Sequence, residues 1–360
     1  MCFLHDDENQ SEKILQYLQE LQKPVILYGA SDCGKAYYDI LTKKGIEIEC
    51  FCDDDRIKQQ KLFCGKKVMD SRYLCGGDEP IIISSWGPLK ILRKLRTMDE
   101  KIAQRCIILD LYLWEDGLDY YTYYKSNEDK INQAYQLLYD EKSKKVFSNL
   151  LQYKINREPS LIQEIQDDVR LQYFDSDIMT FTNKEIFLDL GAYNGDTALS
   201  FISNVDEQYK KIIALEPDHD NYMMLLRNTK MFSDIECHCL GIDSASRKIH
   251  FRADSTWTSR VAQDGIDEIQ TTSVDELLKD ERVSFIKADI EGMETAMLIG
   301  AENTIRRDVP KLAIAAYHRK EDIFNLICML HEYSDKYIFY LRHYTELPID
   351  TVLYAIKSNK

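Results

Sequence analysis

The feature that most constrains the fold is an apolar strand followed by a glycine-containing turn and a helix, and this pattern occurs twice in the 360 residues. The first copy is PVILYG at residues 24–29, followed by a helical stretch to about Lys44. The second is IFLDL at residues 186–190, followed by the turn GAYNGDT and a helix from Ala198. Around each copy, short apolar runs alternate with helical patterns, which is typical of parallel strands joined by crossover helices. We therefore predict an α/β chain with two Rossmann-like sheets.

The chain divides into three predicted parts. Residues 1–115 form a smaller Rossmann-like domain, and residues 116–180 form a helical connector or cap, because apolar residues recur there at helical spacing. Residues 181–360 form the larger α/β domain, which ends in two adjacent strand runs at 337–341 and 351–356. Two neighbouring strands after a β-α alternation predict an antiparallel hairpin attached to a parallel sheet. In the first domain, strands are expected at residues 24–29, 46–51, 81–84 and 106–113.

Charge and composition restrict the partners. The chain has 46 basic and 61 acidic residues, and its formal net charge of −15 disfavours general binding to nucleic acids. The opening stretch MCFLHDDENQ has neither the basic nor the apolar section of a secretory signal, and no apolar run is long enough to cross a bilayer. We therefore expect a cytoplasmic protein with no membrane anchor and no nucleic-acid partner. No oligomeric state follows from the sequence.

Ten cysteines are scattered along the chain without a C-x-x-C motif. Two C-x-C pairs, Cys50/Cys52 and Cys237/Cys239, lie in predicted strands, but their spacing is not that of a zinc or iron–sulfur site. We expect reduced thiols and no metal bound by cysteine.

The turn Asp189-x-Gly191-x-x-x-Gly195 is the first candidate binding site. Glycines let the backbone approach a ligand closely, and the N-terminus of the following helix offers free N–H groups to a carboxylate or phosphate. Glu216 follows at the carboxyl end of the next predicted strand, where a carboxylate can accept hydrogen bonds from both hydroxyls of a ribose. A solvated acidic loop is the alternative for Glu216.

Two ligands fit this pattern, a dinucleotide and S-adenosylmethionine. Tyr193 stands where the dinucleotide motif G-x-G-x-x-G has its second glycine, so a pyrophosphate would lack room. Asp189 opposes a diphosphate but suits the ammonium group of an amino acid. Together with the terminal hairpin, these features favour the methyl donor, and an NAD-dependent dehydrogenase is a third interpretation.

A second group of polar residues follows three later strands. Asp289 and Glu291 come at the carboxyl end of one strand, where open α/β sheets bind ligands. For Glu294 we favour a helix N-terminus stabilised by negative charge. His318 follows the next strand, and His343 lies at the end of the penultimate one. Because an acceptor hydroxyl needs a proton acceptor, Asp289 and His318 are the candidate bases, with His343 third.

A variant of this mechanism has Asp289, Glu291 and His318 hold a divalent cation that lowers the pKa of the acceptor hydroxyl. Mixed oxygen and nitrogen ligands are compatible with such an ion, but their spacing does not show that they converge. A divalent metal is therefore possible but not favoured, and we assign no metal ligand from the sequence.

Residues 185–360 resemble the FkbM family of S-adenosylmethionine-dependent methyltransferases. The similar stretches, in consistent order, are FLDLGAYNGDT, ALEPD, SVDELL, FIKADIEGMETAMLIGA, PKLAIAAYHRKEDI and YLRHYTE…TVLYAI. The resemblance implies a class I methyltransferase sheet and O-methylation of a small-molecule or glycan acceptor, at a hydroxyl of a sugar or secondary metabolite. It also implies donor contacts from Asp189, Gly191, Asn194, Gly195, Thr197, Glu216 and Asp218.

The first domain resembles the nucleotide-binding or CoA-binding-like domains of sugar-modifying enzymes, although its turn has only Gly29 and Gly34. A domain that keeps the fold and binds nothing is an equal alternative, because fold does not dictate function. For the whole chain, the alternative function is a non-catalytic scaffold that binds a nucleotide or nucleotide sugar. The candidate bases argue against it, since a binding module needs no base.

Overall fold

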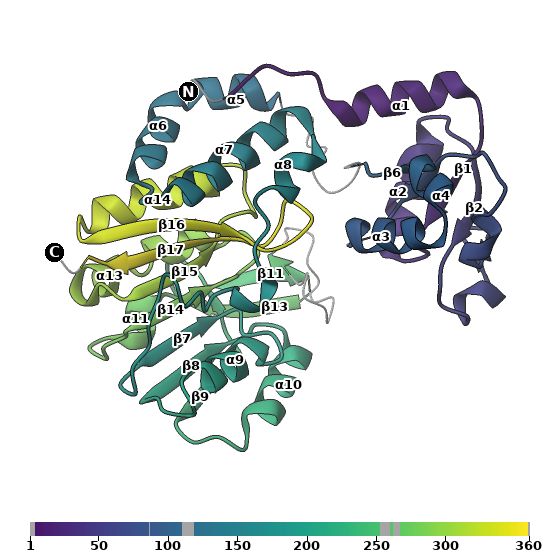
Figure 1. Cartoon of the computed structure of the whole chain (residues 1–360). Coiled ribbons are helices and arrows are strands. Elements are labelled where there is room, and N and C mark those ends of the chain that lie inside the picture. Colours follow the sequence, from purple (N-terminus) through teal and green to yellow (C-terminus); the bar gives the residue numbers. More distant parts are fainter. Residues whose placement is uncertain (1–3, 86, 110–118, 253–259, 262–266, 359–360) are drawn as a thin grey trace. The chain divides into compact units, whose positions relative to one another are not determined.

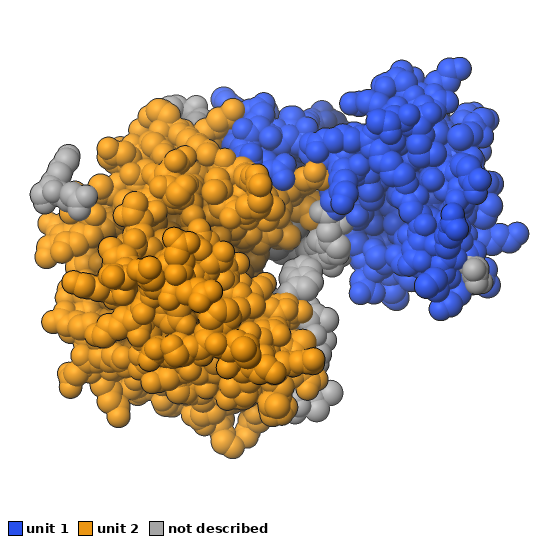
Figure 2. Space-filling model, turned by 60° about the horizontal axis from the view of Figure 1, so that its bottom comes forward, with its two compact units in different colours: residues 1–126, 148–166 blue, residues 127–147, 167–360 orange. Residues whose placement is uncertain are grey.

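The computed structural model describes residues 4–85, 87–109, 119–252, 260–261 and 267–358. The chain forms two compact units, which are coloured separately in Figure 2. Unit 1 comprises residues 1–126 and 148–166, and unit 2 comprises residues 127–147 and 167–360. The three-part division at residues 115 and 180 stays a prediction.

Unit 1 contains an α/β sheet whose six described strands run in the order β3-β4-β2-β1-β5-β6. Neighbouring strands are parallel except for β3 and β4. The bounds are β1 Val25–Tyr28, β2 Ile48–Cys52, β3 Leu62–Phe63, β4 Lys66–Met69, β5 Ile81–Ile83 and β6 Cys106–Ile107. Three predicted strands are confirmed as β1, β2 and β5, and residues 110–113 of the fourth lie outside the described residues. The pair β3–β4 was not predicted, because these strands are short and partly polar.

Local hydrogen bonds explain where the first helix of this unit begins. In the first helix, α1 (Gln10–Leu21), the Asn9 side chain accepts from the backbone N–H groups of Ser11 and Glu12, which have no partner inside the helix. The other α-helices are α2 Asp32–Lys43, α3 Pro88–Met98, α4 Glu100–Arg105, α5 Tyr120–Ser126 and α8 Pro159–Gln163, with short 3-10 turns at Lys58–Gln60 and Ser71–Leu74. Helix α7 (Glu141–Asn156) begins in unit 2 and ends in unit 1.

Unit 2 is built on a sheet whose seven described strands lie side by side in the order β16-β17-β15-β14-β7-β8-β9 (Figure 1). The bounds are β7 Ile186–Leu190, β8 Lys211–Leu215, β9 Ile235–His238, β14 Phe285–Ala288, β15 Lys311–Ala315, β16 Tyr337–His343 and β17 Thr351–Lys357. Only β17 is antiparallel to its neighbours, β15 and β16. The predicted antiparallel hairpin on a parallel sheet is therefore confirmed. Its last strand, β17, lies between β15 and β16, which places β16 at the edge.

The helices of unit 2 cover this sheet. They are α6 Glu128–Leu137, α9 Asp196–Asn204, α10 His219–Thr229, α11 Val274–Leu278, α12 Glu294–Ile299, α13 Glu302–Asp308 and α14 Asp322–Tyr333, with a 3-10 turn at Val169–Leu171. Helix α14 packs against α6, α12 and α13, and α10 packs against α9 and β9. At the centre of the core, the rings of Phe187 and Phe285 stack with their centroids 4.7 Å apart, and Phe201 of α9 packs against both. Burying these aromatic side chains is a large part of what holds α9 to the sheet.

A second, smaller sheet of unit 2 was not predicted from the sequence. Its described strands run in the order β10-β13-β11-β12, with bounds β10 Gly241–Ile242, β11 Lys248–Arg252, β12 Arg260–Val261 and β13 Asp267–Thr272. Two of these strands have only two residues, too short to show a strand pattern in the sequence.

Two further expectations concern cysteines and the membrane. All cysteines in the described ranges are free, and none belongs to a metal-binding cluster there. None of the described helices combines the length and the apolar character needed to span a bilayer.

Candidate functional site

A cavity of about 260 Å³ lies within unit 2. Residues at or just beyond the carboxyl ends of three neighbouring strands line it: Gly191 after β7, Glu216 after β8 and Asp289 after β14. Apolar side chains from the small sheet, Ile249 and Ile269, line it as well. Ligands of open α/β sheets bind at this end of the strands, so the position agrees with the sequence prediction.

The first turn is shaped around Gly191. This residue has a φ of 73°, and a Cβ atom built on it would lie 1.9 Å from the carbonyl oxygen of Asp289. A side chain is therefore excluded by the backbone of the neighbouring strand. The Gly191 N–H donates to the Leu215 carbonyl at 3.1 Å, which joins the turn to β8. Gly195 ends the turn, directly before α9.

Glu216 is held by the backbone of the same turn. Its Oε2 accepts from the Tyr193 N–H and its Oε1 from the Asp218 N–H, both at 2.9 Å. The residue is 6% exposed, and this burial raises the pKa of its carboxyl. Each carboxylate oxygen has two lone pairs, so both can accept a further hydrogen bond from a ligand in the cavity.

Asp189 does not line the cavity; it is paired with a lysine that does. Its Oδ1 lies 3.3 Å from Lys287 Nζ, and both side chains are almost completely buried. Burial raises the pKa of Asp189 to about 6, against the opposing effect of Lys287. Lys287 Nζ also donates to the Gly191 carbonyl at 2.6 Å. Burial lowers the pKa of Lys287, but Asp189 and the carboxylates around it outweigh this and raise it.

The other residues that were predicted to contact the methyl donor fall into two groups. Thr197 lines the cavity, whereas Asn194 and Asp218 do not. Asp218 caps α10 by accepting from the N–H groups of Asp220 and Asn221, at 3.0 and 3.1 Å. Asn194 Oδ1 accepts from the Asp196 N–H at 3.2 Å. These two side chains therefore bind backbone N–H groups at the N-termini of α10 and α9.

Asn221 is a cavity residue that the sequence did not point to. It is 1% exposed, and its Oδ1 has no hydrogen-bond partner among the described residues. A buried polar atom without a partner at a cavity wall is suited to a ligand.

Two tyrosines hold Asp289 at the other end of the cavity. The Tyr173 hydroxyl donates to Asp289 Oδ2 at 2.7 Å, and the Tyr317 hydroxyl donates to Oδ1 at 3.4 Å. The Tyr173 N–H in turn donates to the Tyr354 hydroxyl at 2.9 Å. Neither tyrosine was predicted, because Tyr173 lies 116 residues before Asp289 in the chain.

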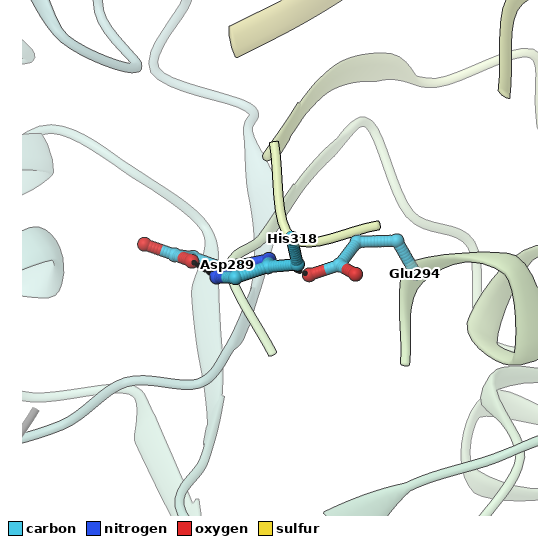
Figure 3. Close-up of side chains that lie close together, drawn as sticks. All are labelled: Asp289, Glu294 and His318. Carbon is cyan, nitrogen blue, oxygen red and sulfur yellow. Dashed lines mark hydrogen bonds and ion pairs between the residues drawn. The ribbon is translucent and has the colours of Figure 1, made fainter. Parts of the chain in front are cut away.

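His318 lies between two carboxylates (Figure 3). Its Nδ1 is 2.9 Å from Glu294 Oε1, and its Nε2 is 3.5 Å from Asp289 Oδ1 and 3.6 Å from Glu291 Oε2. Burial acts to lower the pKa of His318, but the carboxylates, Glu294 first, outweigh it and raise it to about 10. The structure thus brings His318 to Asp289, which the sequence spacing had left open. It also shows that Glu294, at the start of α12, is completely buried and faces the imidazole.

His343 does not lie at the cavity. It is a fully buried residue of β16, and its Nδ1 is 2.9 Å from Thr351 Oγ1 on β17. Burial lowers the pKa of His343 to about 4, so the ring is neutral at pH 7. We therefore leave His343 out of the proposed site.

Residues 189–345 match the family model described as the Methyltransferase FkbM domain. The chain is similar to the crystal structure of methyltransferase FkbM from Methylobacillus flagellatus KT, with 22% identity and a TM-score of 0.75 over 95% of this chain and 92% of that one. An rRNA methylase from Streptococcus thermophilus has 13% identity and a TM-score of 0.34 over 57% of this chain and 96% of that one.

Fibrillarin from Aeropyrum pernix, solved with natively bound S-adenosyl-L-methionine, has 14% identity and a TM-score of 0.33 over 50% of this chain and 70% of that one. No curated protein matches the chain. The residues matched by the FkbM methyltransferase domain model include the glycine turn, Glu216 and the cluster around His318.

Proposed function

We propose that the chain is an S-adenosylmethionine-dependent methyltransferase that methylates a hydroxyl group of a small-molecule or glycan acceptor, such as a sugar or secondary metabolite. The observation that carries this proposal is a single cavity that joins two kinds of groups. The first kind is Gly191 and Glu216, which line the cavity after β7 and β8. The second is Asp289, which lines it after β14.

The donor half of the cavity fits the proposed cofactor. Glu216 presents two oxygens, each fixed by one backbone N–H and each with a lone pair left for a ribose hydroxyl. Asn221 offers a buried Oδ1 to a donor group of the ligand, and Gly191 leaves the turn without a side chain. When bound, S-adenosylmethionine supplies a methyl group that its sulfonium sulfur activates. Transfer of this group to the acceptor oxygen leaves S-adenosylhomocysteine as the second product.

The acceptor half needs a group that takes the hydroxyl proton. Asp289 is the proposed proton acceptor, because its carboxylate lines the cavity and is oriented by Tyr173 and Tyr317. His318 is a positioning residue in this proposal. With a pKa of about 10, its ring is protonated at neutral pH as long as only the carboxylates surround it, so it is not a base in that state.

Calorimetry tests the donor half directly. S-adenosylmethionine and S-adenosylhomocysteine are titrated into the full chain, its Glu216→Gln variant and a control, Glu236→Gln. Glu236 is a half-exposed residue of β9 that pairs with Lys211 and does not line the cavity. We expect Glu216→Gln to weaken binding at least about tenfold, or 1.4 kcal/mol, and the control to bind as the parent does.

Equal affinities for the parent and Glu216→Gln would overturn the ribose assignment. Absence of any binding by the parent would overturn the function. With binding established, a screen of sugar and secondary-metabolite acceptors by mass spectrometry should show a mass gain of one methylene group on a hydroxyl-bearing acceptor.

A further inference from the structure

We propose that His318 Nε2, Asp289 Oδ1 and Glu291 Oε2 bind a divalent cation at the acceptor end of the cavity, and that Glu294 orients His318 for this purpose. The existence of the cation site is independent of the methyl donor, whereas the role that we give the cation rests on the proposed function.

The unpartnered ring nitrogen of His318 is the first observation that points to a ligand. The His318 side chain is 10% exposed, and Nε2 is buried without a hydrogen-bond partner among the described residues. It nevertheless faces two carboxylate oxygens, Asp289 Oδ1 at 3.5 Å and Glu291 Oε2 at 3.6 Å. A buried polar atom in this situation calls for a partner that lies between the three groups.

The two distances from His318 Nε2 are close to those between ligands of one cation. Nitrogen and oxygen atoms bound about 2.1 Å from a metal lie roughly 3.0–3.4 Å from one another in octahedral or tetrahedral sites. The observed 3.5 and 3.6 Å exceed this range by only a few tenths of an ångström. Glu291 lies in the turn between β14 and α12, where its backbone is left-handed with a φ of 53°.

Glu294 occupies the position of an outer-shell partner. Its Oε1 accepts from the Ile290 N–H at 3.1 Å and contacts His318 Nδ1 at 2.9 Å. In Figure 3 the imidazole separates Glu294 from Asp289, so Glu294 is on the Nδ1 side and away from Nε2. A carboxylate that accepts from Nδ1–H leaves the Nε2 lone pair to a metal, and histidine ligands commonly have such a partner. Glu294 is therefore assigned to orientation and not to coordination.

The donor set indicates which cation binds. One imidazole and two carboxylates suit a first-row transition metal such as Mn²⁺ or Zn²⁺ better than Mg²⁺, which prefers oxygen ligands. Three protein ligands leave coordination positions for other molecules. Because Asp289 and Glu291 both line the cavity, those positions face the space in which the acceptor binds.

The cation would act on the acceptor hydroxyl. An oxygen bound to a divalent cation has a lowered pKa, so a weaker proton acceptor suffices and the alkoxide character needed for methyl transfer is stabilised. When Asp289 Oδ1 binds the cation, Asp289 Oδ2 stays oriented by Tyr173 and takes the hydroxyl proton on its second lone pair.

Titration of Mn²⁺ into the full chain tests the site. After treatment with EDTA and its removal, free Mn²⁺ is counted by electron paramagnetic resonance in the parent, Glu291→Gln, His318→Gln and a control, Glu302→Gln. Glu302 lies on α13, where it pairs with Arg306 on the surface. We expect one tight site per chain in the parent and control, and affinity at least about tenfold weaker in the two ligand variants.

The His318→Gln variant separates the proposal from its alternative, in which His318 is only an imidazolium among carboxylates. Removing a positive charge from an acidic cluster would leave Mn²⁺ binding unchanged or tighter, and that result would overturn the assignment. Equal affinities for Glu291→Gln and Glu302→Gln, or no site in the parent, would also overturn it. Circular dichroism and thermal unfolding must show each variant folded.

Calorimetry with S-adenosylmethionine on the same samples distinguishes the two proposals. Donor binding without a Mn²⁺ site rejects only the cation, and a Mn²⁺ site without donor binding rejects only the proposed methyltransferase function.

Discussion

Lys287 and Asp189 are direct partners across the parallel strands β14 and β7, and their side chains form a buried ion pair with Nζ and Oδ1 3.3 Å apart. Because Lys287 Nζ also donates to the Gly191 carbonyl, one lysine joins two strands to the turn that lines the cavity. The register of β14 against β7 therefore sets the position of the glycine turn that begins at Gly191.

Removal of this lysine should destabilise unit 2. Lys287→Met leaves the Asp189 carboxyl buried without its cation, and we expect a loss of about 3–5 kcal/mol in the free energy of unfolding, measured by urea denaturation. The double variant Lys287→Met/Asp189→Asn removes both charges and should regain much of that loss. If the single and double variants were equally unstable, the pairing would not be the cause.

Replacement of Gly191 should weaken binding of S-adenosylmethionine. The Cβ of Gly191→Ala would meet the Asp289 carbonyl, so we expect S-adenosylmethionine affinity to fall by more than about tenfold, the equivalent of 1.4 kcal/mol, in calorimetry. Gly45→Ala is the matched control, because Gly45 also has a positive φ but a Cβ there meets nothing within 4 Å. Unchanged affinity of Gly191→Ala would show that the turn is not part of the donor site.

Neutralising Asp289 should affect turnover more than donor binding. For Asp289→Asn we expect the rate of methyl transfer to fall at least about 100-fold, the usual contribution of a positioned base, while S-adenosylmethionine affinity stays within about threefold. Asp234→Asn, at an exposed aspartate after α10, is the control and should keep full turnover. Full activity of Asp289→Asn would remove Asp289 from the mechanism.

His343 should make the protein sensitive to acid through its burial. The folded-state pKa is about 4, below the ordinary value of 6.5, so the unfolded chain binds a proton first as the pH falls. The contribution of neutral His343 to the free energy of unfolding is therefore fully present above pH 6.5. It declines toward pH 4 by up to about 3 kcal/mol, at 1.36 kcal/mol per pKa unit. His343→Gln should lose less stability than the parent between pH 7 and pH 4.5 in urea denaturation. Parallel pH profiles for the two proteins would contradict this account.

Much of the fold could be predicted from local signals. Apolar runs such as Ile186–Leu190 are completely buried strands, as their composition indicates, and the turn with Gly191 and Gly195 follows directly. The terminal hairpin was predicted as well. Its strand order was not, because the apolar pattern of β16 and β17 is the same whichever of them contacts β15.

The chain alone determined the alternation of strands and helices, the glycine turn and the family resemblance, because each depends on residues close together in the sequence. Tertiary packing decided which histidine lies beside the cavity, since His318 and His343 both lie at or just beyond strand ends but, of the two, His318 contacts acidic side chains of the cavity wall. It also decided the pairing of Lys287 with Asp189, 98 positions away, and of Tyr173 with Asp289. Such contacts arise from strand order and register, which bring together residues that no local pattern relates.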